Sequence, residues 1–182
     1  MIGSDFMILR KLNAWLSLFT TLLFFDHAIF HAVWMLSKGT IEKSADSMPK
    51  ILFVFMMLHA IISIILTIIN YTGNEKCKSK NYPNMNRPTY IQRISGIALI
   101  PLTVLHILGT IGILTPPQVV HAILPPLFFA ICLMHVAIST NKAFITLGFG
   151  NARFIKIADV VMKLICVVTL IADVVGFYIY LV

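Results

Sequence analysis

Residues 50–71, which read KILFVFMMLHAIISIILTIINY, decide what class of protein this is. After Lys50, the stretch contains no charged residue and only one histidine, His59. Its length matches the ~20 predominantly apolar residues that an α-helix needs to cross a bilayer. Because lipid offers no water to pair backbone amides, such a stretch crosses the membrane as a helix. We therefore predict a transmembrane helix over 50–71.

Four further apolar stretches lie around it, and Gly and Pro residues mark the breaks between them. They cover about residues 12–37, 90–114, 118–148 and 155–182. The composition agrees: 59% of the 182 residues are hydrophobic and 12% are charged, whereas a soluble domain carries about 25% charged residues. We predict an all-α fold, with residues 1–182 forming a single integral membrane bundle of five transmembrane helices.

Basic residues are distributed unevenly among the expected loops. They occur at the N-terminus, in the second loop and in the fourth loop, at Arg10, Lys11, Lys76, Lys78, Lys80, Arg87, Arg153 and Lys156. The third loop and the C-terminal tail carry no charge. The positive-inside rule then predicts a multi-pass protein of the cell inner (cytoplasmic) membrane, with its N-terminus in the cytoplasm and its C-terminus outside. The same rule accounts for the net charge of +7, so we expect no nucleic-acid partner.

All six histidines lie inside the apolar stretches. The first stretch carries His27 and His31, the next two carry His59 and His106, and the fourth carries His121 and His135. Ionisable side chains are costly within a membrane and are usually functional. A single histidine of this kind is most simply explained by a hydrogen bond to a neighbouring helix. Four successive helices that each carry one instead indicate metal ligands.

The depth of the histidines sorts them into pairs. At ~1.5 Å of rise per residue, His106 and His27 fall in the outer half of the bilayer, whereas His59 and His135 reach the inner half. Each pair can ligate the iron of one b-type haem at both axial positions, an arrangement that suits electron transfer. His31 follows His27 by four residues on the same helix face. The ligand on the first helix is therefore either His27 or His31.

The remaining polar residues within the membrane have two interpretations each. His121 is either an interfacial histidine in contact with headgroup water or a hydrogen-bond donor at an outer quinone site. Asp26 and Asp173 either pair with polar groups or carry protons. Cys132 and Cys166 are expected to be small core residues.

Three motifs along the chain together resemble a known family. The segment YIQRISG at 90–96, followed by His106, is similar to a helix that carries Gln-Arg-x-[Ser/Thr]-Gly and then a haem histidine. His135, Lys142 and the Leu-Gly-Phe turn at 147–149 are similar to the fourth helix of the same family, and His59 with residues 69–71 is similar to its second helix. The family is the five-helix dihaem cytochrome b membrane anchor of succinate dehydrogenases and fumarate reductases.

The resemblance implies a function. The chain would be the anchor and electron-transfer subunit of a succinate:quinone or quinol:fumarate oxidoreductase, and would not be a catalyst alone. Two b haems would pass electrons between a membrane quinone, menaquinone in the dihaem class, and a partner pair made of a flavoprotein subunit and an iron–sulfur subunit. His59 and His135 would ligate one haem, and His106 with His27 or His31 would ligate the other.

The resemblance also suggests residues that contact the haems. Arg93 and Lys142 are candidates for the haem propionates, because of their charge and position. Ser95 and Gly96 complete the proposed cofactor contacts, since small residues let a flat macrocycle approach the backbone. Leu133 stands where some members of the family use a Glu in proton transfer, so that proton route is not expected here.

Two other functions fit the same apolar helices. The chain can be the haem b anchor of a different membrane dehydrogenase, or a small membrane transporter or scaffold without haem. The first alternative is disfavoured by five helices with a candidate ligand on each of the first four. Haem binding separates the second alternative from the others.

Overall fold

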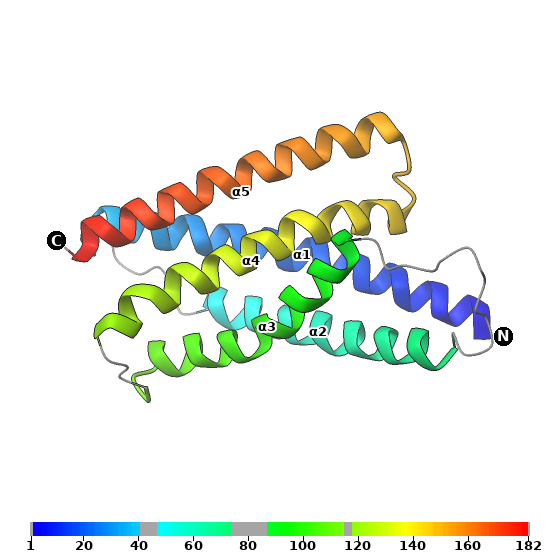
Figure 1. The fold of residues 1–182 in the computed structure, drawn as a ribbon, viewed down its shortest axis with the longest axis horizontal. Helices are drawn as coiled ribbons and strands as arrows, with labels where there is room; N and C mark the ends of the chain where they lie inside the picture. The colour runs from blue at the N-terminus through cyan, green and yellow to red at the C-terminus, as the bar shows by residue number, and fades with distance from the viewer. Residues whose placement is uncertain (1, 41–46, 74–86, 115–117, 182) are drawn as a thin grey trace.

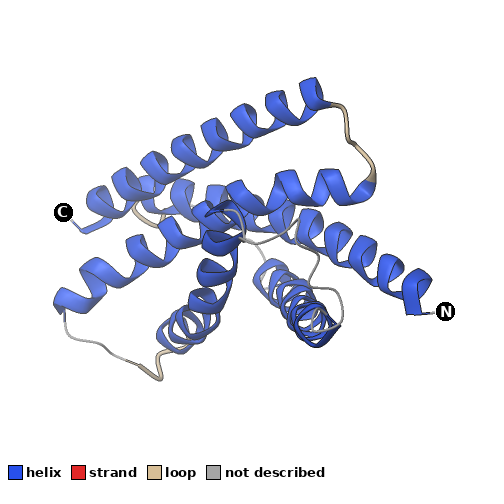
Figure 2. Ribbon diagram, turned by 45° about the vertical axis from the view of Figure 1, so that its right-hand side comes forward, coloured by secondary structure: helices blue, strands red, loops and turns tan. Residues whose placement is uncertain are grey.

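A computed structural model describes residues 2–40, 47–73, 87–114 and 118–181. They form five helices, which are α1 (Ile2–Leu36), α2 (Ser47–Gly73), α3 (Arg87–Thr110), α4 (Gln118–Leu147) and α5 (Ala152–Leu181). Successive helices run in opposite directions, and the two termini lie at opposite ends of the bundle (Figure 1). The described residues contain helices and turns but no strand (Figure 2). The predicted all-α fold is confirmed.

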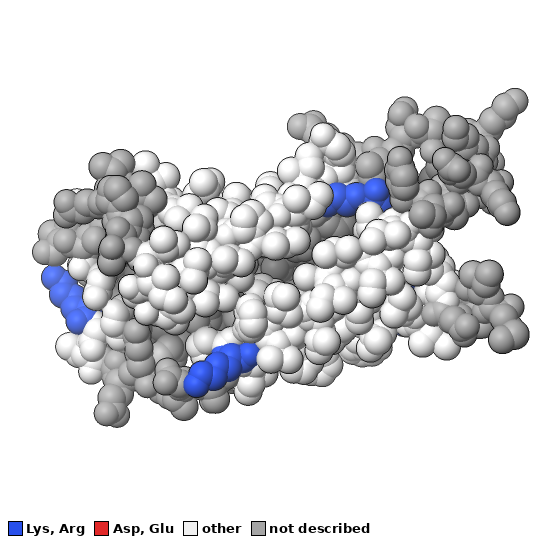
Figure 3. All heavy atoms as spheres, turned by 90° about the horizontal axis from the view of Figure 1, so that it is seen from below, with Lys and Arg blue, Asp and Glu red and all other residues white. Residues whose placement is uncertain are grey.

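All five helices are long and apolar enough to cross a membrane. Many large apolar side chains face outward, among them Leu22, Ile97 and Leu164, each more than 60% exposed. On the face shown in Figure 3, Lys and Arg atoms form only small separate patches in a mostly uncharged surface. An apolar surface this extensive would be unstable in water and is suited to lipid. The chain is therefore a multi-pass membrane protein.

Two helix ends differ from the apolar stretches that predicted them. The first helix starts at Ile2 instead of about residue 12, because a helix satisfies its own backbone hydrogen bonds whether its side chains are apolar or not. The third helix ends at Thr110 instead of about residue 114. Gly112 lies just beyond that end and has a φ of 76°, in the left-handed region that glycine adopts readily.

The centre of the bundle is α1, which packs against α2, α4 and α5. The apolar core between α1, α4 and α5 contains Ala28, Phe129, Leu133 and Cys166. Cys132 is also buried, so both cysteines have the core positions expected for them. Gly176 brings α5 close to α1, since a Cβ built on it would lie 3.2 Å from the backbone oxygen of Ala32, and small residues allow such approaches in many membrane bundles.

The helices α2 and α3 are attached differently from the other three. Among the described residues, α2 packs mainly against α1, and α3 packs mainly against α4. Thr103 on α3 approaches Met56 on α2, with 4.0 Å between Oγ1 and Sδ. Figure 1 shows α3 changing direction along its length, and Pro101 lies inside it, where a proline removes a helical hydrogen bond. The faces of α1, α2, α3 and α4 that turn toward one another therefore leave room for a cavity.

Candidate functional site

A small polar cavity of about 130 Å³ lies among the first four helices. Its volume is below the ~300–1,000 Å³ of preformed small-molecule sites. The lining combines two cations, a histidine and several neutral polar groups, and it consists of Arg10, Asn13, Ala14, Ser17, His59, Leu66, Gln92, Ser139, Lys142, Ala143 and Thr146. So many polar side chains within an apolar bundle indicate a ligand-binding site, since each costs free energy when it faces lipid.

His59 brings α2 to this cavity. Its Nδ1 is buried and has no hydrogen-bond partner among the described residues. One turn further along α2, the Ser63 hydroxyl donates a hydrogen bond to Oδ1 of Asn13 on α1, at 3.1 Å. That bond holds α2 against α1 while it leaves the His59 ring at the cavity wall. The His59 ring interacts with the backbone of Asn13, and its buried Nδ1 is available to a ligand, as are Thr20 Oγ1 and Asn141 Oδ1 among the described residues.

Lys142 is held at the cavity by two side chains of α3. Its Nζ donates to Thr89 Oγ1 at 2.8 Å and to Gln92 Oε1 at 2.7 Å. The Gln92 amide then donates from Nε2 to Ser139 Oγ at 3.2 Å. The Ser139 hydroxyl donates to the backbone oxygen of His135, at 2.6 Å. A continuous polar network therefore joins α3 to α4 beside the cavity.

His135 lies at the other end of this network, against α3. Its Nδ1 is 2.9 Å from Ser95 Oγ, and that hydroxyl is also 3.0 Å from the backbone oxygen of Gln92. A Cβ atom built on Gly96 would lie 3.2 Å from Cε1 of His135. The glycine thus leaves the space that the imidazole uses. Ser95 and Gly96, which we expected at a haem face, both contact the histidine.

The structure brings the candidate ligands together in two groups. His135 is close enough to His59 to interact with it electrostatically. His106 interacts electrostatically with His27, His31 and Asp173, and its interaction with His27 is the strongest of the three. The first group contains His59 and His135, and the second contains His106 with both candidate ligands of the first helix.

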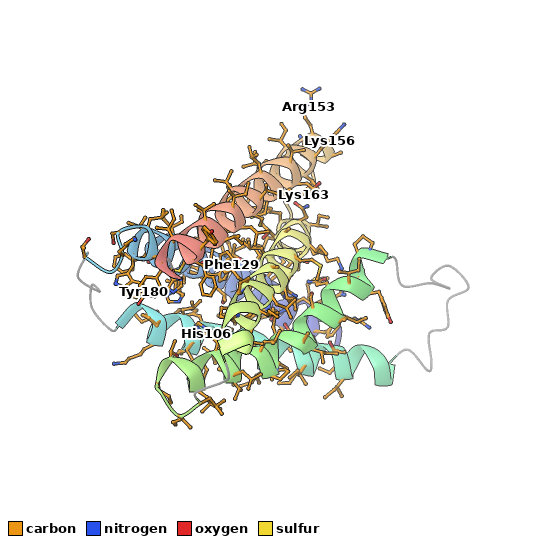
Figure 4. All side chains as sticks on the ribbon, turned by 60° about the vertical axis from the view of Figure 1, so that its left-hand side comes forward. His106, Phe129, Arg153, Lys156, Lys163 and Tyr180 are labelled. Carbon is orange, nitrogen blue, oxygen red and sulfur yellow. The ribbon has the colours of Figure 1, made fainter. Side chains whose placement is uncertain are left out.

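The two groups lie at different levels of the bundle. Gly96, which contacts His135, precedes His106 by ten residues on α3. Ten residues of helix correspond to roughly 15 Å of rise. His106 stacks on Phe128 of α4, with 5.1 Å between the ring centroids. Figure 4 shows His106 near the end of the bundle where Tyr180 lies, away from Arg153 and Lys156 at the start of α5.

His27 and His31 have different surroundings. The His31 side chain is 46% exposed, and its Nδ1 lies 3.5 Å from Oδ1 of the buried Asp173 on α5. The His31 ring also stacks on Trp34, at 6.2 Å between centroids. His27 is more buried than His31, and it interacts more strongly with His106. The two rings stack on each other at 6.4 Å between centroids, and His31 differs from His27 in its contact with Asp173.

Several predicted residues lie apart from the cavity or outside the description. Arg93 is exposed, is within electrostatic range of Lys142, and does not line the cavity. Asp26 is exposed beside His27. The side chains of His121, Asn70 and Tyr71, and the second-loop residues Lys76, Lys78 and Lys80, lie outside the described part of the chain.

Sequence analysis missed four polar residues of the cavity, which are Arg10, Asn13, Gln92 and Thr146. Arg10 was interpreted only as an orientation signal, and Gln92 only as part of a motif. The available signal was the spacing on the first helix, where Arg10, Asn13 and Ser17 follow one another at intervals of three and four residues. Such spacing places polar side chains on one face of a helix, and that face lines the cavity.

Among the described residues, no three His, Cys, Asp or Glu side chains cluster as they do at a metal ion held by several protein ligands. Bis-histidine ligation of a haem requires only two. No family model matches the chain, and no match to a curated protein or a solved structure is found.

Proposed function

We propose that this chain is a membrane anchor and electron-transfer subunit that binds two b haems. The observation that carries the proposal is the pairing of histidines across the bundle. His59 lies near His135, and His27 lies near His106, with the two pairs at different levels. Each pair takes one residue from each of two helices, which is the donor set that bis-histidine haem ligation requires.

The residues present at the inner pair fit a haem. The buried Nδ1 of His59 has no partner among the described residues. Imidazole nitrogens are suitable ligands for iron. The cavity beside it is lined mostly by polar and small residues, among them the cations Arg10 and Lys142, and His135 is not part of its lining. The cations suit the anionic propionates of a haem.

The chain's own residues would hold the group and prepare its environment. His59 and His135 would supply the axial nitrogens of one haem, and His27 and His106 those of the other. When bound, each haem iron accepts and releases one electron at a time. Thr89 and Gln92 hold the Lys142 ammonium at the cavity wall before any ligand enters, which lowers the entropy lost on binding.

The wider function follows from the resemblance of three motifs to the succinate dehydrogenase and fumarate reductase anchors. We infer that a flavoprotein subunit and an iron–sulfur subunit dock on the membrane face where α1 begins, and that a quinone reacts within the membrane. The basic residues Arg10, Arg93, Arg153 and Lys156 at the corresponding helix ends agree with a cytoplasmic face under the positive-inside rule.

Single histidine substitutions test the haem assignment. His106→Ala and His135→Ala should each lower the haem content of the purified protein from two per chain to one, measured as the pyridine haemochrome. The control is His31→Ala, which removes a histidine of the same helix bundle that pairs with Asp173. Full haem content in both His106→Ala and His135→Ala would contradict the ligand assignment.

Isolation of the native complex tests the partners. An affinity-tagged chain, solubilised from the membranes of its own cells, should retain a subunit with bound flavin and a subunit with iron–sulfur signals in electron paramagnetic resonance. The complex should interconvert succinate and fumarate with a quinone analogue. Recovery of a different dehydrogenase with the haem-loaded chain would instead support the anchor of another respiratory enzyme.

A further inference from the structure

The hydroxyl of Ser95 lies within hydrogen-bond distance of two groups. Its Oγ is 3.0 Å from the backbone oxygen of Gln92, to which it donates, and 2.9 Å from Nδ1 of His135. A serine hydroxyl has one proton and two lone pairs. In the arrangement where the proton goes to the Gln92 carbonyl, Ser95 accepts from Nδ1 of His135. In the other tautomer of His135, Ser95 would instead donate to Nδ1.

The first arrangement gives His135 a defined tautomer. If Ser95 accepts, Nδ1 of His135 carries the proton and Nε2 carries the free lone pair. We propose that Ser95 is a positioning residue that fixes His135 as an Nε2 donor before any metal binds. Ser95 is suited to this because it is 1% exposed, so water does not compete for its hydroxyl.

Neighbouring contacts fix the orientation of the ring as well as its tautomer. Gly96 leaves space for Cε1 of the imidazole, so the ring lies against the α3 backbone. Ser139, which follows His135 by one turn, is held by the Gln92 amide and donates to the His135 backbone oxygen. Two side chains and one glycine of α3 thus fix one histidine of α4 from three directions.

The hydrogen bond should also affect the electronic character of the ligand, and this part rests on the proposed haem function. A metal-ligating histidine that donates from its second nitrogen is a more basic ligand. A more basic imidazole stabilises the oxidised iron and lowers the midpoint potential. Loss of the Ser95 hydroxyl should therefore raise the potential of one haem and leave the other unchanged.

The tautomer is tested on the protein without haem. The full chain, labelled with ¹⁵N in its histidine rings and purified haem-free in detergent, should show a His135 signal with Nδ1 protonated and Nε2 unprotonated. The signal is assigned by its loss in His135→Ala. Ser95→Ala should convert it to a mixture of tautomers or to the Nε2-protonated form, and Ser95→Thr, which keeps the hydroxyl, should restore it. An unchanged His135 tautomer in Ser95→Ala would overturn the proposal.

The potentials are tested on the haem-loaded chain by redox titration of the reduced-minus-oxidised spectrum. Ser95→Ala should move one of two midpoints upward. The matched control is Thr140→Val. It removes an equally buried hydroxyl that donates to the backbone oxygen of Val136, and it should leave both midpoint potentials unchanged. Unchanged midpoints in Ser95→Ala would overturn the electronic part. A chain that binds no haem yet changes tautomer in Ser95→Ala would contradict the proposed function and leave the role of Ser95 standing.

Discussion

The ammonium of Lys142 lies 2.7 Å from Oε1 of Gln92, so a charged hydrogen bond crosses from α4 to α3 within the membrane. Gln92 also donates to Ser139 through its Nε2. One amide thus uses both of its ends to join two helices that are also linked by the Lys142–Thr89 and Ser95–His135 contacts. This relationship explains how α3, which packs mainly against α4, keeps a fixed register beside the cavity.

Gln92→Leu should weaken the contact between α3 and α4, because it leaves Lys142 with Thr89 alone and removes the donor to Ser139. The expected loss of unfolding free energy is about 1–3 kcal/mol, the usual cost of leaving such groups without partners. Reversible unfolding in mixed detergent micelles measures it. Thr169→Val is the control, since that hydroxyl donates only to the backbone of Ile165 on the same helix. Equal stability of the two variants would show that the Gln92 network is not stabilising.

Substitution of two helical glycines should have different effects. A Cβ on Gly96 would approach the His135 ring to 3.2 Å, whereas a Cβ on Gly109 would meet nothing within 4 Å. Gly109→Ala should therefore stabilise the protein by up to ~1 kcal/mol, the helix-propensity difference. Gly96→Ala should stabilise the protein less than Gly109→Ala does, or destabilise it. It should also lower the occupancy of one haem. Unfolding and haem content, measured on both variants, check the prediction; equal values would rule out close packing at Gly96.

The two histidines of α1 should differ in their effect on haem content. His27→Ala should lower it from two per chain to one, because His27 is the more buried of the two and interacts with His106. His31→Ala should keep two haems and instead leave the buried Asp173 without its partner. The pyridine haemochrome gives the haem content, and a single haem in His31→Ala with two in His27→Ala would reverse the assignment.

Two arginines at the same end of the bundle should also differ. Arg10 lines the cavity, but Arg93 is exposed and lies outside its lining. Arg10→Gln should weaken retention of one haem during gel filtration, because a cation that suits the propionates is lost. Arg93→Gln should retain both haems. The haem-to-protein absorbance ratio after chromatography measures retention, and the opposite ranking would favour Arg93 as the propionate residue.

The sequence predicted the number of helices well because lipid imposes a simple rule of length and apolarity. It predicted helix ends less well, since Arg10 and Lys11 continue a helix whose apolar stretch begins after them. It also paired the histidines by depth, because a regular helix rise converts residue number into height. Depth alone did not separate His27 from His31, which lie only one turn apart.

The cavity lining was harder to predict because it depends on which helix faces meet. Gln92 and Lys142 are 50 residues apart in sequence, and only the packing of α3 against α4 brings them together. The space beside Gly96 was foreseen, but its occupant was not: in the structure it receives the His135 ring. The sequence identified Gly96 as a small residue, whereas the packing of α4 against α3 determines that the His135 ring fills the space beside it.

The most direct test of the central claim is the haem content of the wild-type chain, purified as a folded monodisperse protein in detergent. A reduced-minus-oxidised spectrum with a b-type α-band, together with a pyridine haemochrome ratio of two haems per chain, is the predicted result. A colourless preparation that is folded by circular dichroism, and that stays colourless when haem is supplied, would contradict it.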